Sequence, residues 1–422
     1  MKKKLLIIQV AALSKELNID GLKFFKTQSV FPAVTCTVQA SFRTASLPSD
    51  HGMVANGVFF KDLRKPLFWE QSSRLVNGRR IWEDFRKRGK KVAILFWQQS
   101  LGEDADIILS PAPIHKHHGG MIQAFYSKPD NYYEKLCRKI GSKFKLSQYW
   151  GPMASWKVGD WIAKSIVETL KDNELSPDLC LTYLPTLDYD LQRKCPDSKQ
   201  EYDKILVKAE VQLNEIYSEA VQAGYDVIIF GDYDIKPATG ALFPNLALKN
   251  AGLMKVRNIA GMEYPDFYIS QAFAVVDHEV AHVYTRNDSI QKAYNELSKL
   301  PGVAKVLGRD AQKDFGIDHP NSGELVLLAE VGKWFAYPWW EEKKNAPDYA
   351  SHVDIHNKPG FDPCELFWGW PPGSVSLNTD KIRGSHGLTG PGREVVWAST
   401  LPIHGNIESL VDLSKAVQKL LD

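Results

Sequence analysis

The sequence SVFPAVTCTVQASFRTASLPSDHGMVAN, residues 29–56, changes from an apolar run to helical periodicity at Thr35. Val38, Ser41 and Phe42 follow at the spacing of one helix face, so the pattern predicts a helix that begins at Thr35. A hydroxyl at the start of a helix lies near free amide groups and the positive end of the helix dipole, which suits phosphate binding and stabilises an alkoxide. Thr35 is therefore a candidate nucleophile. A threonine also serves as an ordinary helix cap, and the residues alone leave both interpretations open.

Short apolar runs without strict polar alternation recur along the chain, as expected for buried strands of a parallel sheet. These runs cover residues 5–10, 92–97, 179–184, 227–230 and 324–329. A long amphipathic helix is predicted over about residues 199–223. Strands that alternate with helices predict an α/β fold, with a doubly wound, mainly parallel sheet and helices on both faces. Ligands bind such folds outside the carboxyl ends of the strands, so the chemistry should lie in the segments that follow the strands.

Composition and organisation limit the class of protein. The 422 residues contain no obvious linker, repeat or low-complexity segment, so we expect one domain over residues 1–422, with an inserted smaller lobe within residues 237–380. Lys and Arg (52) nearly balance Asp and Glu (50), which argues against a general nucleic-acid binder. Five scattered cysteines do not suggest a disulfide framework, which favours a cytoplasmic location. The N-terminal apolar run is too short for a membrane span and lacks a convincing cleavage site, so no membrane association is expected.

The spacing after Thr35 resembles the nucleotide pyrophosphatase/phosphodiesterase branch of the alkaline phosphatase superfamily. In that branch the nucleophilic Thr is followed by Thr, Pro, His-Gly and Asn at fixed distances, and the same distances here reach Thr44, Pro48, His51, Gly52 and Asn56. The resemblance implies an alkaline phosphatase-like fold, nucleophilic attack by Thr35 on phosphorus, and a hydrogen bond from Asn56 to a non-bridging phosphoryl oxygen. Cys36 is a rival nucleophile next to Thr35, but the spacing favours Thr35.

Further matches follow two of the predicted strands and recur near the C-terminus. The positions that match metal-ligand positions of the family are Asp188, Asp232 and His386. The positions that depart, where the family has Asp or His, are Ala11, Gln192 and Tyr233. Each predicted metal site therefore contains residues that match the family and residues that depart from it.

In the family, two metal ions hold the phosphoryl oxygens and activate the Thr, as in other in-line displacement sites. The resemblance assigns one metal to Asp188, Gln192 and His386. It assigns the other to Thr35, Asp232 and, as a weaker candidate, Tyr233. Neutral Gln and Tyr are poorer zinc ligands than imidazole, so the resemblance implies one or two ions of Zn, Mg or Mn, or a fold that has lost catalysis.

Three other groups supply additional candidate ligands. The first comprises Asp277, His278 and His282, and the second comprises Asp354 and His356. The third comprises His115, His117 and His118. The first cluster lies in His-Glu-Val-Ala-His, residues 278–282, which matches the zincin metalloprotease pattern if it is helical. Its β-branched and aromatic flanks favour a strand instead, in which residues four apart cannot share one ion.

The sequence therefore predicts a metal-dependent hydrolase of phosphodiester or pyrophosphate bonds that acts on a small-molecule phosphate ester through Thr35. Two alternatives stay open. One is a non-catalytic ligand-binding member of the fold with degraded metal sites, and the other is a zincin-type metalloprotease.

Overall fold

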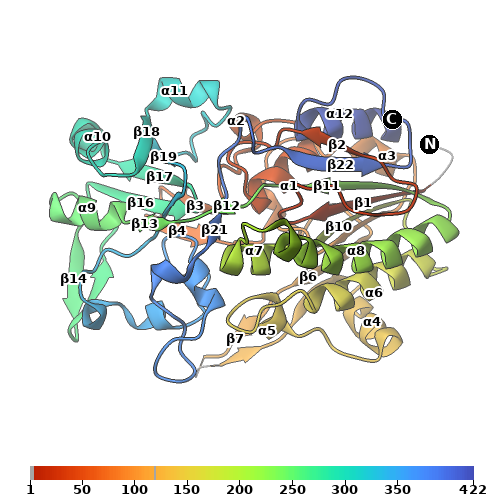
Figure 1. The fold of residues 1–422 in the computed structure, drawn as a ribbon, viewed down its shortest axis with the longest axis horizontal. Coiled ribbons are helices and arrows are strands. Elements are labelled where there is room, and N and C mark those ends of the chain that lie inside the picture. The colour runs from red at the N-terminus through yellow and green to blue at the C-terminus, as the bar shows by residue number, and fades with distance from the viewer. Residues whose placement is uncertain (1–3, 118–119) are drawn as a thin grey trace.

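The computed structural model describes residues 4–117 and 120–422, so the candidate ligand His118 lies outside the described residues. A sheet of eight strands lies in the right half of the view in Figure 1. The strand order is β2-β22-β11-β1-β10-β5-β6-β9. In chain order these strands are β1 (Lys4–Val10), β2 (Phe24–Thr27), β5 (Val92–Leu95), β6 (Ile107–Pro111), β9 (Phe125–Lys128), β10 (Leu179–Leu184), β11 (Tyr225–Gly231) and β22 (Val395–Ser399). Four of the predicted runs are therefore strands of this sheet.

Parallel pairing dominates the middle of the sheet. β1 pairs in parallel with both β10 and β11, and β5 and β6 continue the parallel order. β9 and β22 add antiparallel pairing toward the two edges. β10 and β11 are buried along their whole length, which explains their apolar sequences, because both faces of a parallel sheet are covered.

Helices cover both faces of the sheet, which confirms the predicted fold class (Figure 1). One face carries α1 (Thr35–Thr44), α3 (Glu83–Lys87) and α12 (Leu410–Leu421). The other carries α4 (Tyr132–Ile140), α6 (Val158–Lys171), α7 (Asp188–Lys194) and α8 (Lys199–Gln222). α8 buries the predicted apolar stripe that includes Ile205, Ala209 and Leu213, and the Ser198 side chain caps its first turn.

A second sheet is entirely antiparallel and has the order β16-β17-β19-β18. Its strands are β16 (Ala272–Asp277), β17 (Val280–Thr285), β18 (Val303–Leu307) and β19 (Leu325–Ala329). The expectation that residues 324–329 form a parallel strand of the main sheet is therefore wrong. The run is buried and apolar, as predicted, but its neighbours are the antiparallel strands β17 and β18.

Shorter elements connect and flank the two sheets. The strands are β3 (Gly57–Phe60), β4 (Lys65–Phe68), β7 (Ile114–His115), β8 (Met121–Ile122), β12 (Lys236–Pro237), β13 (Gly240–Leu242), β14 (Val256–Ile259), β15 (Met262–Pro265), β20 (Lys333–Phe335) and β21 (Gly384–Ser385). The helices are α2 (Pro48–His51), α5 (Leu146–Tyr149), α9 (Pro244–Asn250), α10 (Ile290–Leu297) and α11 (Arg309–Asp314). Across residues 4–117 and 120–422, no helix has both the length and the apolarity to cross a bilayer.

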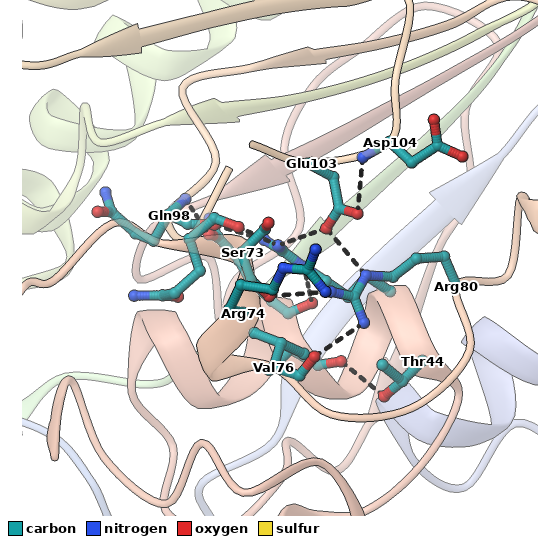
Figure 2. Close-up of polar contacts among 12 residues, drawn as sticks. Thr44, Ser73, Arg74, Val76, Arg80, Gln98, Glu103 and Asp104 are labelled. Atoms are coloured by element: carbon teal, nitrogen blue, oxygen red, sulfur yellow. Dashed lines mark hydrogen bonds and ion pairs between the residues drawn. The ribbon is translucent and has the colours of Figure 1, made fainter. Parts of the chain in front are cut away.

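A buried ion-pair network fixes α1 against the loop after β5. Arg43, near the end of α1, is fully buried and donates to the main-chain oxygens of Gln98 and Gln99. Its guanidinium lies 3.5 Å from Glu103, which also accepts a 2.9 Å hydrogen bond from Arg80. Figure 2 shows Arg80 between Glu103 and the Val76 carbonyl. Two cations therefore depend on one buried carboxylate.

We predict that Glu103→Gln destabilises the fold by about 3–5 kcal/mol, because Arg43 then stays buried without an anion. Urea unfolding followed by circular dichroism measures the loss. The control is Glu83→Gln on α3, which removes an exposed pair with Lys87 and should leave the unfolding midpoint unchanged. An unaltered midpoint for Glu103→Gln would show that Arg43 needs no counter-charge.

Candidate active site

A cavity of about 650 Å³ contains most of the predicted site residues. The predicted residues that line it are Thr35, Asn56, Asp188, Gln192, Tyr233, His278, Asp354, His356 and His386. Asp188 follows β10 and Tyr233 follows β11, so the cavity lies beyond the carboxyl ends of adjacent parallel strands, as the fold predicts. Asp232, Asp277 and His282 are almost fully buried and do not contribute to the lining.

Thr35 is the first residue of α1, which confirms the predicted start of the helix. The capping position belongs to Val34, whose side chain makes no cap hydrogen bond, so the interpretation of Thr35 as an ordinary helix cap is wrong. Two phenols lie beside its hydroxyl. Burial raises the pKa of Tyr183 and Tyr233 well above the ordinary tyrosine value, and a hydrogen bond with Thr35 opposes that shift in both.

Asn56 is fixed at both ends of its amide. Its Oδ1 accepts from the Cys36 main-chain N–H at 3.0 Å, which holds it against the first turn of α1. Its Nδ2 donates to Asp277 Oδ1 at 3.1 Å, and its own main-chain N–H donates to Asp277 Oδ2 at 2.7 Å. Asp277, at the end of β16, therefore orients Asn56 beside Thr35. One Nδ2 proton of Asn56 is left for a ligand, because an amide nitrogen carries two.

Cys36 is not a suitable nucleophile. Its side chain is fully buried behind the cavity wall and accepts a hydrogen bond from Gln99 Nε2 at 3.3 Å. Burial raises the pKa of its thiol to about 12, so the reactive thiolate is not formed near neutral pH. The structure therefore favours Thr35 over its neighbour, in agreement with the spacing.

Asp188 begins α7, and two side chains donate to its carboxylate. Gln192 Nε2 lies 2.7 Å from Oδ2, and the Tyr233 hydroxyl lies 2.9 Å from Oδ1. Burial raises the pKa of Asp188 to about 6. The two donors come from positions at which the resemblance expects metal-ligating histidines.

Asp232 directly follows β11 and is completely buried. Its Oδ2 accepts from Gln9 Nε2 at 2.7 Å, and its Oδ1 accepts from the Ala12 main-chain N–H at 3.0 Å. Burial raises its pKa to about 8. β1 and the turn after it thus supply both hydrogen bonds, and no carboxylate stands at the intervening Ala11.

His386 is held by its main-chain neighbour and by stacked rings. Its Nδ1 lies 2.7 Å from the Ala33 carbonyl oxygen, which accepts only if Nδ1 carries the proton. The Tyr233 ring stacks on it with centroids 3.5 Å apart, and the His278 ring lies 3.7 Å away. Burial lowers the pKa of His386 well below the ordinary value, so the ring is neutral.

These residues do not fit the two-metal centre that the resemblance implies. Within the described part of the chain, no group of three or more His, Cys, Asp or Glu side chains could hold a metal ion. Both oxygens of Asp188 and both of Asp232 already accept hydrogen bonds from donors of this chain. Each donor directs its hydrogen at a lone pair of the carboxylate, so the lone pairs that these four donors use do not bind a cation.

The weaker ligand candidates Asp354 and His356 lie on a loop at the cavity wall. Asp354 Oδ1 accepts from the main-chain N–H groups of His356 and Asn357, and His356 Nδ1 lies 3.0 Å from the Phe68 carbonyl oxygen. These contacts shape the loop and do not bring the two side chains to one ion.

The zincin alternative is wrong, because residues 278–282 form a hairpin and not a helix. His278 and Glu279 make the turn between β16 and β17, with His278 at φ 59°. Glu279 pairs with Arg393, and His282 lies on β17. His278 Nδ1 lies 2.7 Å from Asp277 Oδ1, and no described residue partners its Nε2. The three protease residues therefore point to different partners.

His282 uses both ring nitrogens for the main chain. Its Nδ1 accepts from the Gly323 N–H at 3.2 Å, and its Nε2 lies 3.1 Å from the Val54 carbonyl oxygen. This pairing requires the neutral ring with its proton on Nε2. Burial accordingly lowers the pKa of His282 to about 4.

Sequence reasoning missed two polar side chains, Tyr183 beside Thr35 and Gln9 beside Asp232. Tyr183 lies in an otherwise ordinary buried strand, β10, and its hydroxyl reaches the cavity. Gln9 lies in the equally apolar β1. An amide side chain inside a buried strand needs a partner, so Gln9 was a signal in the sequence that a polar group faces it.

We predict that the stability contributed by His282 falls as the pH drops below about 6.5. Its pKa in the folded state lies below the ordinary value, so unfolding takes up a proton in this range. His282 contributes its full stability above pH 6.5 and loses up to about 1.4 kcal/mol per pH unit as the pH falls toward 4. Urea midpoints of His282→Gln should depend less on pH between 6.5 and 4. His404→Gln, an exposed control, should keep the parent slope.

Comparisons with known proteins agree with this architecture. The family model described as type I phosphodiesterase / nucleotide pyrophosphatase matches residues 11–362. Murine ectonucleotide pyrophosphatase/phosphodiesterase 5 superposes with a TM-score of 0.55 at 12% identity, covering 99% of this chain and 95% of that one. Phosphonoacetate hydrolase from Sinorhizobium meliloti, in complex with phosphonoformate, superposes with a TM-score of 0.61 at 15% identity, covering 100% and 96%. A search of curated proteins finds no match. The chain thus belongs to the type I phosphodiesterase / nucleotide pyrophosphatase family, whose members are hydrolases.

Proposed function

We propose that this protein hydrolyses a phosphodiester or pyrophosphate bond in a small molecule, with Thr35 as the nucleophile. The observation that carries the proposal is the position of the Thr35 hydroxyl, at the start of α1 on the wall of the 650 Å³ cavity. Related structures support the ligand class, because a murine relative is described in complex with AMP and the bacterial hydrolase in complex with phosphonoacetate.

The residues around Thr35 supply a nucleophile, a route for its proton and stabilisation of the phosphoryl oxygens. Thr35 Oγ forms the new bond to phosphorus while the bond from phosphorus to the leaving oxygen breaks. The hydroxyl proton passes to the Tyr233 oxygen as Tyr233 gives its own proton to Asp188, to which it is hydrogen-bonded at 2.9 Å. The positive end of the α1 dipole and the remaining Nδ2 proton of Asn56 stabilise charge on the non-bridging oxygens. Water then attacks phosphorus while the bond from phosphorus to Thr35 Oγ breaks. The proton held by Asp188 returns through Tyr233 to Thr35 Oγ, and a proton of the water leaves with the released phosphate.

The family generally depends on divalent metal ions, but the residues at the matching positions of this chain do not fit them. No step of the proposed reaction is therefore assigned to a metal. The substrate's phosphoryl charge must be balanced by neutral donors and by the helix dipole.

The cavity lining favours a substrate with little negative charge beyond one phosphoryl group. Within the part of the chain that the structure describes, no lysine or arginine lines the cavity, and its acidic lining residues are Glu70, Asp188 and Asp354. Aromatic side chains such as Trp69, Trp150 and Phe361 form much of the remaining wall. A phosphodiester with a neutral or cationic leaving group suits this wall better than a nucleoside triphosphate, because like charges repel in a partly buried site.

The second candidate is a protein that binds a phosphate ester without hydrolysing it. The observation that favours it is the replacement of expected metal ligands by Gln192 and Tyr233. The experiment on Thr35 separates the two candidates, because only hydrolysis requires the hydroxyl.

We predict that Thr35→Ala lowers the turnover of an aryl phosphodiester by at least ~10³-fold, since the attacking oxygen is lost. Thr35→Ser should keep part of the activity, because only a methyl group is removed. Release of p-nitrophenol from bis(p-nitrophenyl) phosphate measures the rate, and ATP should be turned over less well.

Cys36→Ala is the matched control, because it changes the adjacent buried side chain and leaves the hydroxyl in place. Parent-like turnover by Thr35→Ala would refute Thr35 as the nucleophile. Binding of the diester without turnover in the parent protein would instead support the non-catalytic candidate.

A further inference from the structure

We infer that this site works without bound divalent metal, because side chains of the chain itself occupy the hydrogen-bonding positions that metal ions would fill. The inference deepens the proposed function and rests on it for the place of the substrate beside Thr35. It also identifies the responsible positions, which are Ala11, Gln192 and Tyr233.

Asp188 is bound by two side-chain donors. A metal ligand directs a lone pair at the ion, whereas a hydrogen-bond donor directs a positively polarised hydrogen at the carboxylate. Gln192 Nε2 and the Tyr233 hydroxyl occupy the two sides of Asp188 at 2.7 and 2.9 Å. Both side chains therefore place positively polarised hydrogens beside the carboxylate, where a metal ion would otherwise lie.

Asp232 has its own set of donors. Gln9 Nε2 and the Ala12 N–H bind its two oxygens at 2.7 and 3.0 Å. The neighbouring Ala11 is completely buried and presents only a methyl group. A second anionic ligand, which a divalent ion needs for charge balance, is thus missing from this part of the site.

The rings of Tyr233 and His386 form an aromatic stack. The Tyr233 ring lies parallel to the His386 imidazole, with an angle of 3° between their planes, while its hydroxyl reaches Asp188. One side chain therefore covers His386 and also binds Asp188. Tyr233 links the two matched ligand positions by packing and hydrogen bonding, so that no ion is required between them.

The competing arrangement has the Gln192 amide reversed, with Oε1 toward Asp188 and a cation between the two oxygens. Gln192 Oε1 has no hydrogen-bond partner among the described residues, and reversing the amide would turn this acceptor toward Asp188. Metal content distinguishes it from the donor network, because two facing acceptors need the cation and a donor–acceptor pair does not.

The first measurement is the metal content of the purified full chain after chelation and dialysis against Zn²⁺, Mn²⁺ or Mg²⁺. We expect well below one equivalent of each ion by elemental analysis, and no change in Tm on addition of a chelator, because an ion bound only to the folded state would raise Tm. One equivalent or more, lost in Asp188→Asn, would overturn the inference and leave Thr35 as a possible nucleophile.

The second measurement restores the expected ligands with Ala11→Asp, Gln192→His and Tyr233→His in one variant. We expect this variant to gain at least one equivalent of Zn²⁺ and a Zn²⁺-dependent increase in Tm. Adding Asp188→Asn is the matched control and should remove the gained metal. Gln192→His and Tyr233→His are also made singly, in case the triple variant does not fold.

Folded variants that gain no metal would overturn the assignment of these positions. Failure of the proposed function has a different signature, which is parent-like turnover by Thr35→Ala with unchanged metal content. The two claims can therefore fail independently.

Discussion

The burial of two carboxylates at one edge of the parallel sheet is the constraint on which the rest of the site depends. Asp188 and Asp232 follow β10 and β11, the two neighbours of β1, and both are almost completely removed from water. A carboxyl group in such a place is costly unless hydrogen-bond donors or cations satisfy its oxygens. This chain supplies donors, and Gln9 in the apolar strand β1 is explained by that need.

Another buried carboxylate, Asp277, connects the two sheets. Asn56 lies against α1 from one side and is held by Asp277, at the end of β16 in the antiparallel sheet, from the other. α1 itself is fixed further along by the buried Arg43 and Glu103. The position of Thr35 therefore depends on contacts from both sheets, although the helix that begins with it is a local feature of the sequence.

This difference between local and distant contacts decides what the sequence could predict. The start of α1 and the extent of β10 and α8 follow from periodicity within short segments, and the structure confirms them. The pairing of β19 depends on strands far along the chain, and an apolar run does not encode its partner. The cavity brings together most of the candidate residues because the topology, and not their spacing, places the ends of the strands together. Tyr183 was missed because a tyrosine in a buried strand has the same pattern whether its hydroxyl faces the core or a cavity.

The charge balance of the cavity links the donor network to the chemistry proposed for Thr35. In displacement at phosphorus, charge spreads over the non-bridging oxygens, and catalysis consists mainly of positioning and electrostatic stabilisation. Around Thr35 this stabilisation comes from the α1 dipole, Asn56 and two phenols, which are weaker than a pair of divalent ions because each carries only a partial charge. A site with these weaker donors best suits a substrate with a good leaving group, which needs little stabilisation as it departs. The acidic and aromatic lining, with Glu70 and Asp354 among the residues that face the cavity, further favours a leaving group that adds no negative charge.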